Sequence, residues 1–208
     1  MKTQIFEEHY ENYCRQIAEI DFFRIKDTLC IEHRGQEVVI PFLGEHYIVS
    51  QSGVKDESGK RPNYMICVIL AKYLLMCPDA PVLNKEWCTL KELRRMSQFT
   101  NINVFTSDTE KPIVKHYSGR INALVEASRK LGGKSFDMST SYDFAYEFMI
   151  LPRIETLLVF NDGDDEFPAT CSLLFQKQAE HYLDPESLIM AGIVFAKHLK
   201  AADAMAKK

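Results

Sequence analysis

The sequence predicts a single α+β domain with a mostly antiparallel sheet and about four packed helices. Strand-like and helix-like segments occur in clusters along the 208 residues, whereas a doubly wound parallel fold requires regular alternation. Connections between neighbouring strand-like segments are short, and a parallel crossover needs about a dozen residues or more. The hydrophobic content of 46% is enough for a core without metals or disulfides. We therefore expect one domain over residues 1–208.

The first twenty residues are expected to form an amphipathic helix. Apolar residues recur at spacings of four and three, which places them on one helical face: Phe6, Tyr10, Tyr13, Ile17 and Ile20. Thr3 is a plausible N-cap, because its hydroxyl can accept a hydrogen bond from a free amide of the first turn. Residues 21–27 are expected to be a transition without regular structure.

Three short extended segments follow, rich in β-branched and apolar residues: Thr28–Glu32, Glu37–Leu43 and His46–Gln51. Gly35 and Gly44 mark the turns between them. Such short connections predict an antiparallel meander. Residues 52–63 contain two glycines and a proline among charged residues and are predicted to be a loop.

Three helices are predicted in the middle of the chain: Tyr64–Cys77, Leu90–Met96 and Ser118–Leu131. The first is apolar on nearly every side, so it should pack centrally. Thr89 and Glu92 form a capping-box pattern that opens the second helix. The pair Gly132-Gly133 ends the third.

The C-terminal third begins with three strand-like segments: Phe144–Leu151, Glu155–Phe160 and Ala169–Phe175. The last two are expected to form a hairpin around a long acidic loop, residues 161–168. Asp184 and Pro185 then provide an N-cap followed by proline at the first helical position. The final helix is expected to reach about Leu199, with a frayed tail over residues 201–208.

Several C-terminal runs carry a resemblance to a known family: Leu151-Pro152-Arg153-Ile154, Asp164-Asp165-Glu166-Phe167-Pro168-Ala169, Leu174-Phe175 and Tyr182-Leu183. An upstream set extends it: Tyr73-Leu74-Leu75, Trp87 with Leu90 and Leu93, and Phe99. Together these runs resemble the prokaryotic family called domain of unknown function 3786. The acidic-Glu-Phe-Pro-Ala run followed by Leu-Phe is the most specific part.

This resemblance implies a family typical of anaerobic bacteria and archaea. Some of its members carry an added cysteine-rich iron–sulfur segment, which is not visible in this sequence. The six cysteines show no C-x2-C pair and no zinc or cluster spacing, so small buried thiols are expected. The resemblance brings no established activity and no assigned cofactor.

Charge and hydropathy exclude several classes of function. A net charge of −4 argues against a nucleic-acid partner bound through phosphate neutralisation. The longest apolar run, residues 65–76, is broken by Lys72 and is too short to span a membrane. No signal-peptide core is visible at the N-terminus. We therefore expect a cytoplasmic protein with no nucleic-acid or membrane partner.

The acidic loop is the most prominent polar cluster of the sequence. Asp162, Asp164, Asp165 and Glu166 stand together at the end of a predicted strand. Their carboxylates could bind Mg²⁺ or Ca²⁺, or act as acid and base, although the spacing does not match an EF-hand loop. The alternative is a solvated hairpin loop in which Glu166 pairs with Arg153 across the strands.

Two further residues are candidates for ligand binding. Arg153 could hold an anion bidentately, or it could bond backbone carbonyls or the acidic loop. Trp87, the single tryptophan, could line a pocket or anchor the core. The candidate ligand-binding set is therefore Trp87, Arg153, Asp164, Asp165 and Glu166.

Motifs for covalent catalysis or nucleotide binding are missing from the sequence. It contains no G-x-S-x-G, no H-E-x-x-H and no phosphate-binding glycine loop. We expect a non-catalytic accessory protein that binds an unknown small molecule or protein, placed by the resemblance in anaerobic iron–sulfur or cofactor metabolism. Two alternatives are open: a metal-dependent enzyme that uses the acidic loop, and a structural subunit of a complex.

Overall fold

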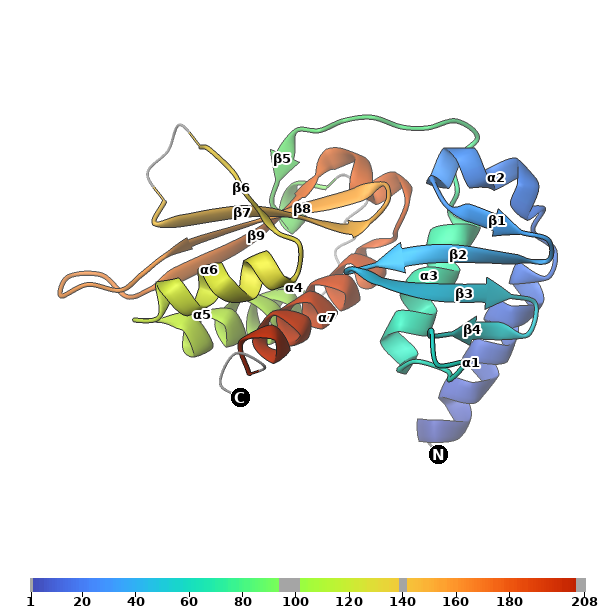
Figure 1. Ribbon diagram of the computed structural model, residues 1–208, viewed down its shortest axis with the longest axis horizontal. Coiled ribbons are helices and arrows are strands. Elements are labelled where there is room, and N and C mark those ends of the chain that lie inside the picture. The colour runs from blue at the N-terminus through green and yellow to red at the C-terminus, as the bar shows by residue number, and fades with distance from the viewer. Residues whose placement is uncertain (1, 94–101, 139–141, 205–208) are drawn as a thin grey trace.

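The computed structural model describes residues 2–93, 102–138 and 142–204. They form two halves that lie side by side, each with one antiparallel sheet (Figure 1). The first half contains α1 (Lys2–Ile17), α2 (Phe22–Leu29), β1 (Glu32–Arg34), β2 (Glu37–Phe42), β3 (Glu45–Ser50), β4 (Gly53–Lys55) and α3 (Tyr64–Leu75). The second half contains β5 (Trp87–Cys88), η1 (Leu90–Glu92), α4 (Ile102–Phe105), η2 (Thr106–Glu110), α5 (Lys111–Tyr117), α6 (Ile121–Lys130), β6 (Lys134–Ser135), β7 (Phe144–Leu151), β8 (Ile154–Asn161), β9 (Thr170–Gln176), η3 (Lys177–His181) and α7 (Pro185–Ala204).

The first sheet is a meander with the strand order β1-β2-β3-β4, and every neighbouring pair is antiparallel, as predicted. β2 and β3 confirm two of the predicted strands, whereas β1 begins only at the last residue of the predicted segment Thr28–Glu32. Gly35 and Gly44 have φ angles of 65° and 82°, the left-handed conformation that such turns need. The region 52–63, predicted as a loop, also contributes the short edge strand β4.

Helix α2 replaces the transition predicted for residues 21–27. Asp21 caps this helix, because its Oδ1 accepts from the N–H of Phe23 at 3.1 Å. The helix ends at Cys30, which adopts the left-handed conformation with φ 55°. The N-cap predicted for the first helix is wrong, because Thr3 lies inside α1.

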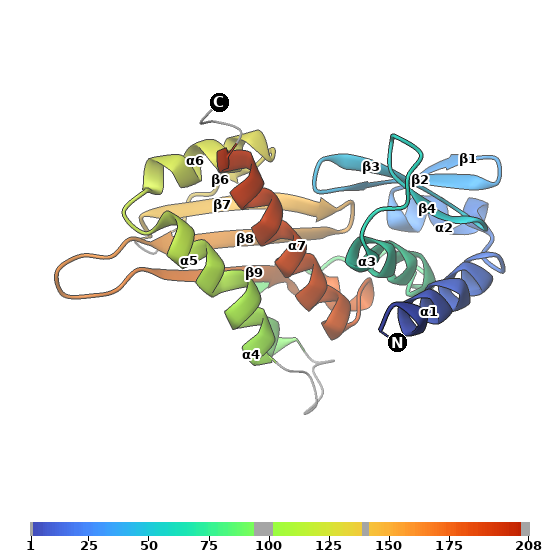
Figure 2. The same cartoon turned by 90° about the horizontal axis from the view of Figure 1, so that it is seen from below.

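The second sheet has the strand order β5-β9-β8-β7-β6, and all of its pairs are antiparallel. β7, β8 and β9 confirm the three strands predicted in the C-terminal third, and β8 and β9 form the predicted hairpin. The edge strands β5 and β6 were not predicted, because runs of 2 residues leave no alternation to read. Helices α4 to α7 cover one face of this sheet (Figure 2).

A continuous helical segment from Ile102 to Tyr117, formed by α4, η2 and α5, has no counterpart in the predictions. Its middle part, η2, is a π turn in which the N–H of Lys111 bonds the carbonyl of Thr106. Pro112 follows directly, and because proline has no N–H the regular helical ladder is interrupted there. The wide turn breaks the 3.6-residue repeat by which helices are identified in a sequence.

The other predicted helices of the middle region agree in place and differ at their ends. α3 confirms the predicted buried helix. α6 begins at Ile121, later than the predicted Ser118, and ends before Gly132, whose φ is 74°. η1 ends at Glu92, and the predicted capping box is present. Positions 94–96 of that predicted helix lie outside the described residues.

Helix α7 continues to Ala204, so the predicted frayed tail is wrong for residues 201–204. The helix packs against α3 in the first half and against α4, α5 and α6 in the second. A Cβ atom at position 192 would lie 2.5 Å from Cε2 of Phe105. α4 therefore approaches α7 so closely because Gly192 has no side chain.

The buried apolar side chains form one continuous cluster that runs through both halves, including Val49, Leu70, Phe160 and Phe195. The predicted fold class, a single α+β domain built on antiparallel strands, is confirmed, although the strands form two sheets and more helices cover them than predicted. Within the described ranges, no helix combines the length and the apolar composition needed to cross a bilayer.

Arg153, in the turn between β7 and β8, joins the second half to the end of α2. Its Nε donates to the carbonyl of Thr28 at 2.7 Å, and its Nη2 donates to the carbonyl of Asp27 at 3.0 Å. The buried hydroxyl of Tyr73 donates to the carbonyl of Leu29 at 2.7 Å. Because the last carbonyls of a helix have no partner within it, these donors complete the C-terminus of α2.

We predict that Arg153→Ala lowers the free energy of unfolding by about 2 kcal/mol, because it removes two charge-assisted hydrogen bonds to backbone carbonyls. Arg153→Lys should recover only part of this loss, since an ammonium group cannot reproduce the guanidinium fork. Urea denaturation measures both effects. Arg129→Ala is the control, because the Arg129 side chain is 62% exposed and its ion pair, with Glu126, lies on the surface. Equal stabilities of the Arg153→Ala and Arg129→Ala variants would contradict the assignment.

Asp184 connects the start of α7 to α3. Its Oδ1 accepts from the backbone N–H of Ser187 at 2.8 Å, and its Oδ2 lies 3.1 Å from Nζ of Lys72. Burial alone would raise the pKa of Asp184, but the hydrogen bonds from Ser187 and the charge of Lys72 outweigh it, and the pKa is lowered. This carboxylate therefore favours the folded state in its ionised form.

Asp184→Asn should lower the free energy of unfolding at neutral pH by roughly 0.5–1 kcal/mol, because asparagine keeps the cap but loses the ion pair. A lowered folded-state pKa gives a contribution that is complete above the ordinary aspartate pKa of about 3.9 and is lost as the pH falls through the folded-state pKa. The difference between wild type and variant should therefore shrink below about pH 4. Chemical denaturation at pH 7, 5 and 3 tests this, and a difference that grows in acid would refute it.

Candidate functional site

A groove of about 670 Å³ lies where the two halves meet, at the C-terminal end of α7. Its lining comes from the β2–β3 turn, the end of α6 and the last turns of α7: Leu43, Gly44, Glu45, Lys130, Leu131, Gly132, Lys197, His198, Ala201 and Ala202. Leucine and alanine side chains make the walls largely apolar. The volume falls within the range of small-molecule sites in proteins, roughly 300–1,000 Å³.

The groove wall at the β2–β3 turn has strained backbone. Leu43 has a φ of 52°, a left-handed conformation that is uncommon for a bulky residue. Its side chain is buried, and its N–H donates to the carbonyl of Ile150 in β7 at 3.0 Å. The strain is therefore maintained by a contact between the halves. Residues held in such conformations cluster at ligand-binding and active sites.

Positive charge predominates at the rim of the groove. Lys130 donates to the carbonyl of Ala202 at 3.3 Å, and Lys197 is exposed. His198 bonds the carbonyl of Val194 through Nδ1 at 2.9 Å, and its Nε2 lies 3.8 Å from Oε1 of Glu45. Two lysines and a histidine thus face one carboxylate.

The single carboxylate of the rim already has a partner. Oε2 of Glu45 accepts from the hydroxyl of Tyr47 at 2.5 Å. Burial, followed by this hydrogen bond, raises the pKa of Tyr47 well above its usual value, so the hydroxyl stays a donor at physiological pH. The groove consequently suits an anionic group better than a cationic one.

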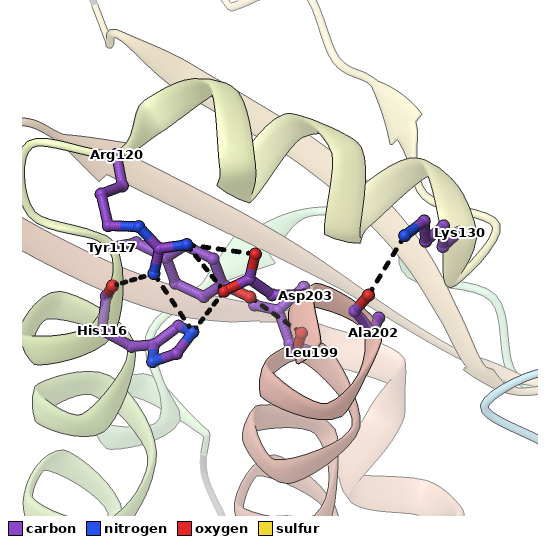
Figure 3. A network of polar contacts seen from close by, with 7 residues as sticks. All are labelled: His116, Tyr117, Arg120, Lys130, Leu199, Ala202 and Asp203. Carbon is purple, nitrogen blue, oxygen red and sulfur yellow. Dashed lines mark hydrogen bonds and ion pairs between the residues drawn. The ribbon is translucent and has the colours of Figure 1, made fainter. Parts of the chain in front are cut away.

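A buried polar network anchors the end of α7 beside the groove (Figure 3). Oδ2 of Asp203 lies 2.7 Å from Nε2 of His116 and 2.9 Å from Nη2 of Arg120. The hydroxyl of Tyr117 donates to the carbonyl of Leu199 at 2.8 Å, and burial and the charge of Asp203 raise its pKa. Because the Asp203 side chain is only 6% exposed, these polar partners hold α7 firmly against α5 and α6.

The acidic loop uses two of its carboxylates to shape its own backbone. Oδ1 of Asp164 accepts from the N–H groups of Glu166 and Phe167, at 2.8 and 2.7 Å. These hydrogen bonds, that from Phe167 first, lower the pKa of Asp164. Oδ1 of Asp162 accepts from the N–H of Gly163 within the loop at 2.9 Å, and from the N–H of Gly119 outside it at 2.7 Å. These hydrogen bonds hold the loop in a defined turn. The ligand-binding roles predicted for the loop stay predictions.

The structure separates Arg153 from the acidic loop. Arg153 precedes β8 and the loop follows it, and a strand of 8 residues spans roughly 25 Å. The predicted pairing of Glu166 with Arg153 is therefore wrong. Arg153 bonds backbone carbonyls of α2, which was the other structural role considered for it.

Trp87 lies in β5 and makes an edge-to-face contact with the ring of Phe136 at 5.9 Å. The two rings meet even though β5 and β6 are the opposite edges of the sheet. Trp87, Arg153 and Asp164 thus contact different parts of the molecule, and the structure does not join them in one site.

The described cysteines are all free thiols, and Cys67 and Cys88 are buried as expected, whereas Cys30 is exposed. Burial raises the pKa of Cys67 and of Cys88 to about 11, which keeps both protonated. Within the described part of the chain, no group of three or more histidine, cysteine, aspartate or glutamate side chains is placed to hold a metal ion.

The groove residues were not found from the sequence, because they come from three distant segments that only the fold brings together. One local signal was available. The Leu43-Gly44 dipeptide sits where a two-residue hairpin turn requires left-handed backbone, a position that favours asparagine, aspartate or glycine. His116 and His198 were missed because neither belongs to a histidine motif.

The comparisons with known proteins identify a family. The model of the family described as "Domain of unknown function (DUF3786)" matches residues 21–198, which include Leu43, Lys130 and His198 of the groove. The comparison with curated proteins and the comparison with solved structures each gave no match. The family model covers most of the chain, and the resemblance in its C-terminal runs is confirmed. The chain therefore belongs to the DUF3786 family.

Proposed function

We propose that this protein is a non-catalytic binding protein that holds an amphipathic anion in the groove at the end of α7. The ligand class is an apolar body that carries one carboxylate. The observation that supports this most directly is the combination of apolar walls with Lys130 and Lys197 at the rim.

The two parts of such a ligand have separate roles. Transfer of an apolar chain from water to the walls contributes about 0.8 kcal/mol for each buried methylene group, so the chain supplies most of the affinity. An exposed lysine at the rim contributes less, about 0.2–1 kcal/mol, but it determines which end of the ligand faces outward. The groove therefore selects an anion over an otherwise identical neutral or cationic molecule.

The chemistry of the lining supports binding without reaction. None of the residues that line the groove is a serine, threonine or cysteine, so no hydroxyl or thiol nucleophile of the lining stands beside His198. We also infer a cytoplasmic location, because the six free thiols of the described chain suit a reducing compartment.

The alternatives stay predictions. The metal-dependent enzyme would use Asp165 and Glu166, since Asp162 and Asp164 already accept backbone hydrogen bonds. The place in anaerobic iron–sulfur or cofactor metabolism depends on the resemblance alone, and the structural-subunit hypothesis is a separate prediction.

Octanoate should bind the wild-type protein more tightly than octanol or octylamine, because the three probes share one chain and differ in charge. In two-dimensional NMR, shifts should centre on residues 43–45, 130–132 and 197–202. Lys197→Gln should weaken octanoate binding about two- to fivefold and leave octanol unchanged. Lys200→Gln is the matched control, since Lys200 is exposed on the same helix and does not line the groove. Tighter binding of octylamine than of octanoate would refute the proposal.

Ala201→Phe should abolish octanoate binding at millimolar concentrations, because the ring occupies the groove. Ala201 is exposed, so the change should alter the free energy of unfolding by no more than about 0.5 kcal/mol. Ala204→Phe provides the comparison, because Ala204 is exposed on the same helix outside the groove. Titration followed by NMR and thermal unfolding measure the two effects. Unchanged octanoate affinity in Ala201→Phe would place the ligand elsewhere.

A further inference from the structure

We propose that a second hollow, on the α5 side of α7, binds the phosphate group of a small molecule. This hollow has a volume of about 520 Å³ and is lined by Ser107, Lys111, Pro112, Lys115, His116 and Lys200. It shares no lining residue with the groove, so the inference does not depend on the proposed function.

The π turn arranges one wall of this hollow. Ser107 lies within η2, and Lys111 and Lys115 follow at intervals of four residues, so all three side chains reach the same hollow. Lys200 reaches it from α7. Single π turns inside helices occur frequently at functional sites, and this one is the only π turn in the described ranges.

The histidine of this hollow, His116 of α5, is held in place by the buried network of Figure 3. Nε2 of His116 contacts Oδ2 of Asp203 at 2.7 Å, which leaves Nδ1 on the other side of the ring. Nη1 of Arg120 donates to the carbonyl of His116 at 3.0 Å and fixes the backbone there. The imidazole is consequently a positioned donor or acceptor at the hollow and not a freely rotating side chain.

The charges of the hollow favour a polyvalent anion. Three lysines line it, no carboxylate lines it, and within the described chain none of the three is paired with a carboxylate. Asp108 lies close by, because its Oδ1 accepts from the hydroxyl of Ser107 at 2.8 Å, and the three lysines outnumber this one carboxylate. Lysines four residues apart on a helix repel each other, and a dianion between them removes this repulsion. The ammonium groups of these lysines match the acceptor oxygens of phosphate.

The concentration of positive charge is local. The whole chain carries a net charge of −4, so the basic lining of the hollow does not reflect its general composition. A surface with this average charge would repel phosphate, and binding would therefore require the specific lysines of the hollow.

The test is a titration of the full chain with inorganic phosphate, pyrophosphate and glucose 6-phosphate, followed by two-dimensional NMR. We expect shifts at residues 107–116 and 200, and weaker binding at higher sodium chloride concentration. Lys111→Gln and Lys200→Gln should each weaken pyrophosphate binding about two- to fivefold, and Lys111→Arg should retain it. Lys197→Gln is the control. It removes an equal charge from α7, the helix that carries Lys200, at a position outside the hollow.

The probes also distinguish the source of the phosphate group. Tighter binding of glucose 6-phosphate than of inorganic phosphate supports a phosphorylated metabolite, and equal binding supports the free ion at the same lysines. Absence of shifts at residues 107–116 with all three probes would overturn the inference. An equal loss of affinity in Lys197→Gln and Lys111→Gln would also overturn it, because it would show general charge attraction. Octanoate binding should be unchanged in Lys111→Gln, so failure of one site is distinguishable from failure of the other.

Discussion

The burial of helix α7 on nearly every side is the constraint on which the rest of the structure depends. Its first turns are capped by Asp184, which also pairs with Lys72 of α3, and its later turns pack against α4, α5 and α6. The helix can occupy this position because Gly192 lets the ring of Phe105 approach its backbone. Both hollows are formed where its last turns emerge from the core, so their shapes follow from the direction of this one helix.

The end of α7 illustrates how one unfavourable group can fix several elements. A carboxylate in the last turn of a helix is opposed by the helix dipole, and burial of Asp203 adds a desolvation cost. Arg120 offsets both effects with its positive charge, and His116 adds a polar contact to the same carboxylate from a second direction. Loss of one partner would leave buried charge unmatched. The wall between the two hollows is therefore expected to be among the most rigid parts of the second half.

Strands and helices with a regular repeat were predictable, and irregular elements were not. β7 and α3 show clear periodicity or continuous burial, and both were found in the correct place. The segment 102–117 was missed because its π turn and Pro112 interrupt the helical repeat. α2 was missed because its 8 residues are too few to show a clear helical repeat, and its cap Asp21 was the stronger physical signal. The hairpin prediction itself places Arg153 and Glu166 at opposite ends of β8, which the expected pairing overlooked.

The candidate site was harder to predict than the fold, because its residues are individually ordinary. The acidic loop attracts attention in the sequence, yet Asp164 uses its carboxylate to bond the loop's own amides. In the sequence Leu43 looks like any strand residue. In the structure its left-handed backbone forms the turn, its buried side chain belongs to the core and the groove wall, and its N–H bonds Ile150. Asparagine or glycine would form the same turn with less strain. Neither would supply the apolar surface. Leucine at this position is therefore explained by its packing in the core and the groove, and not by the needs of the turn.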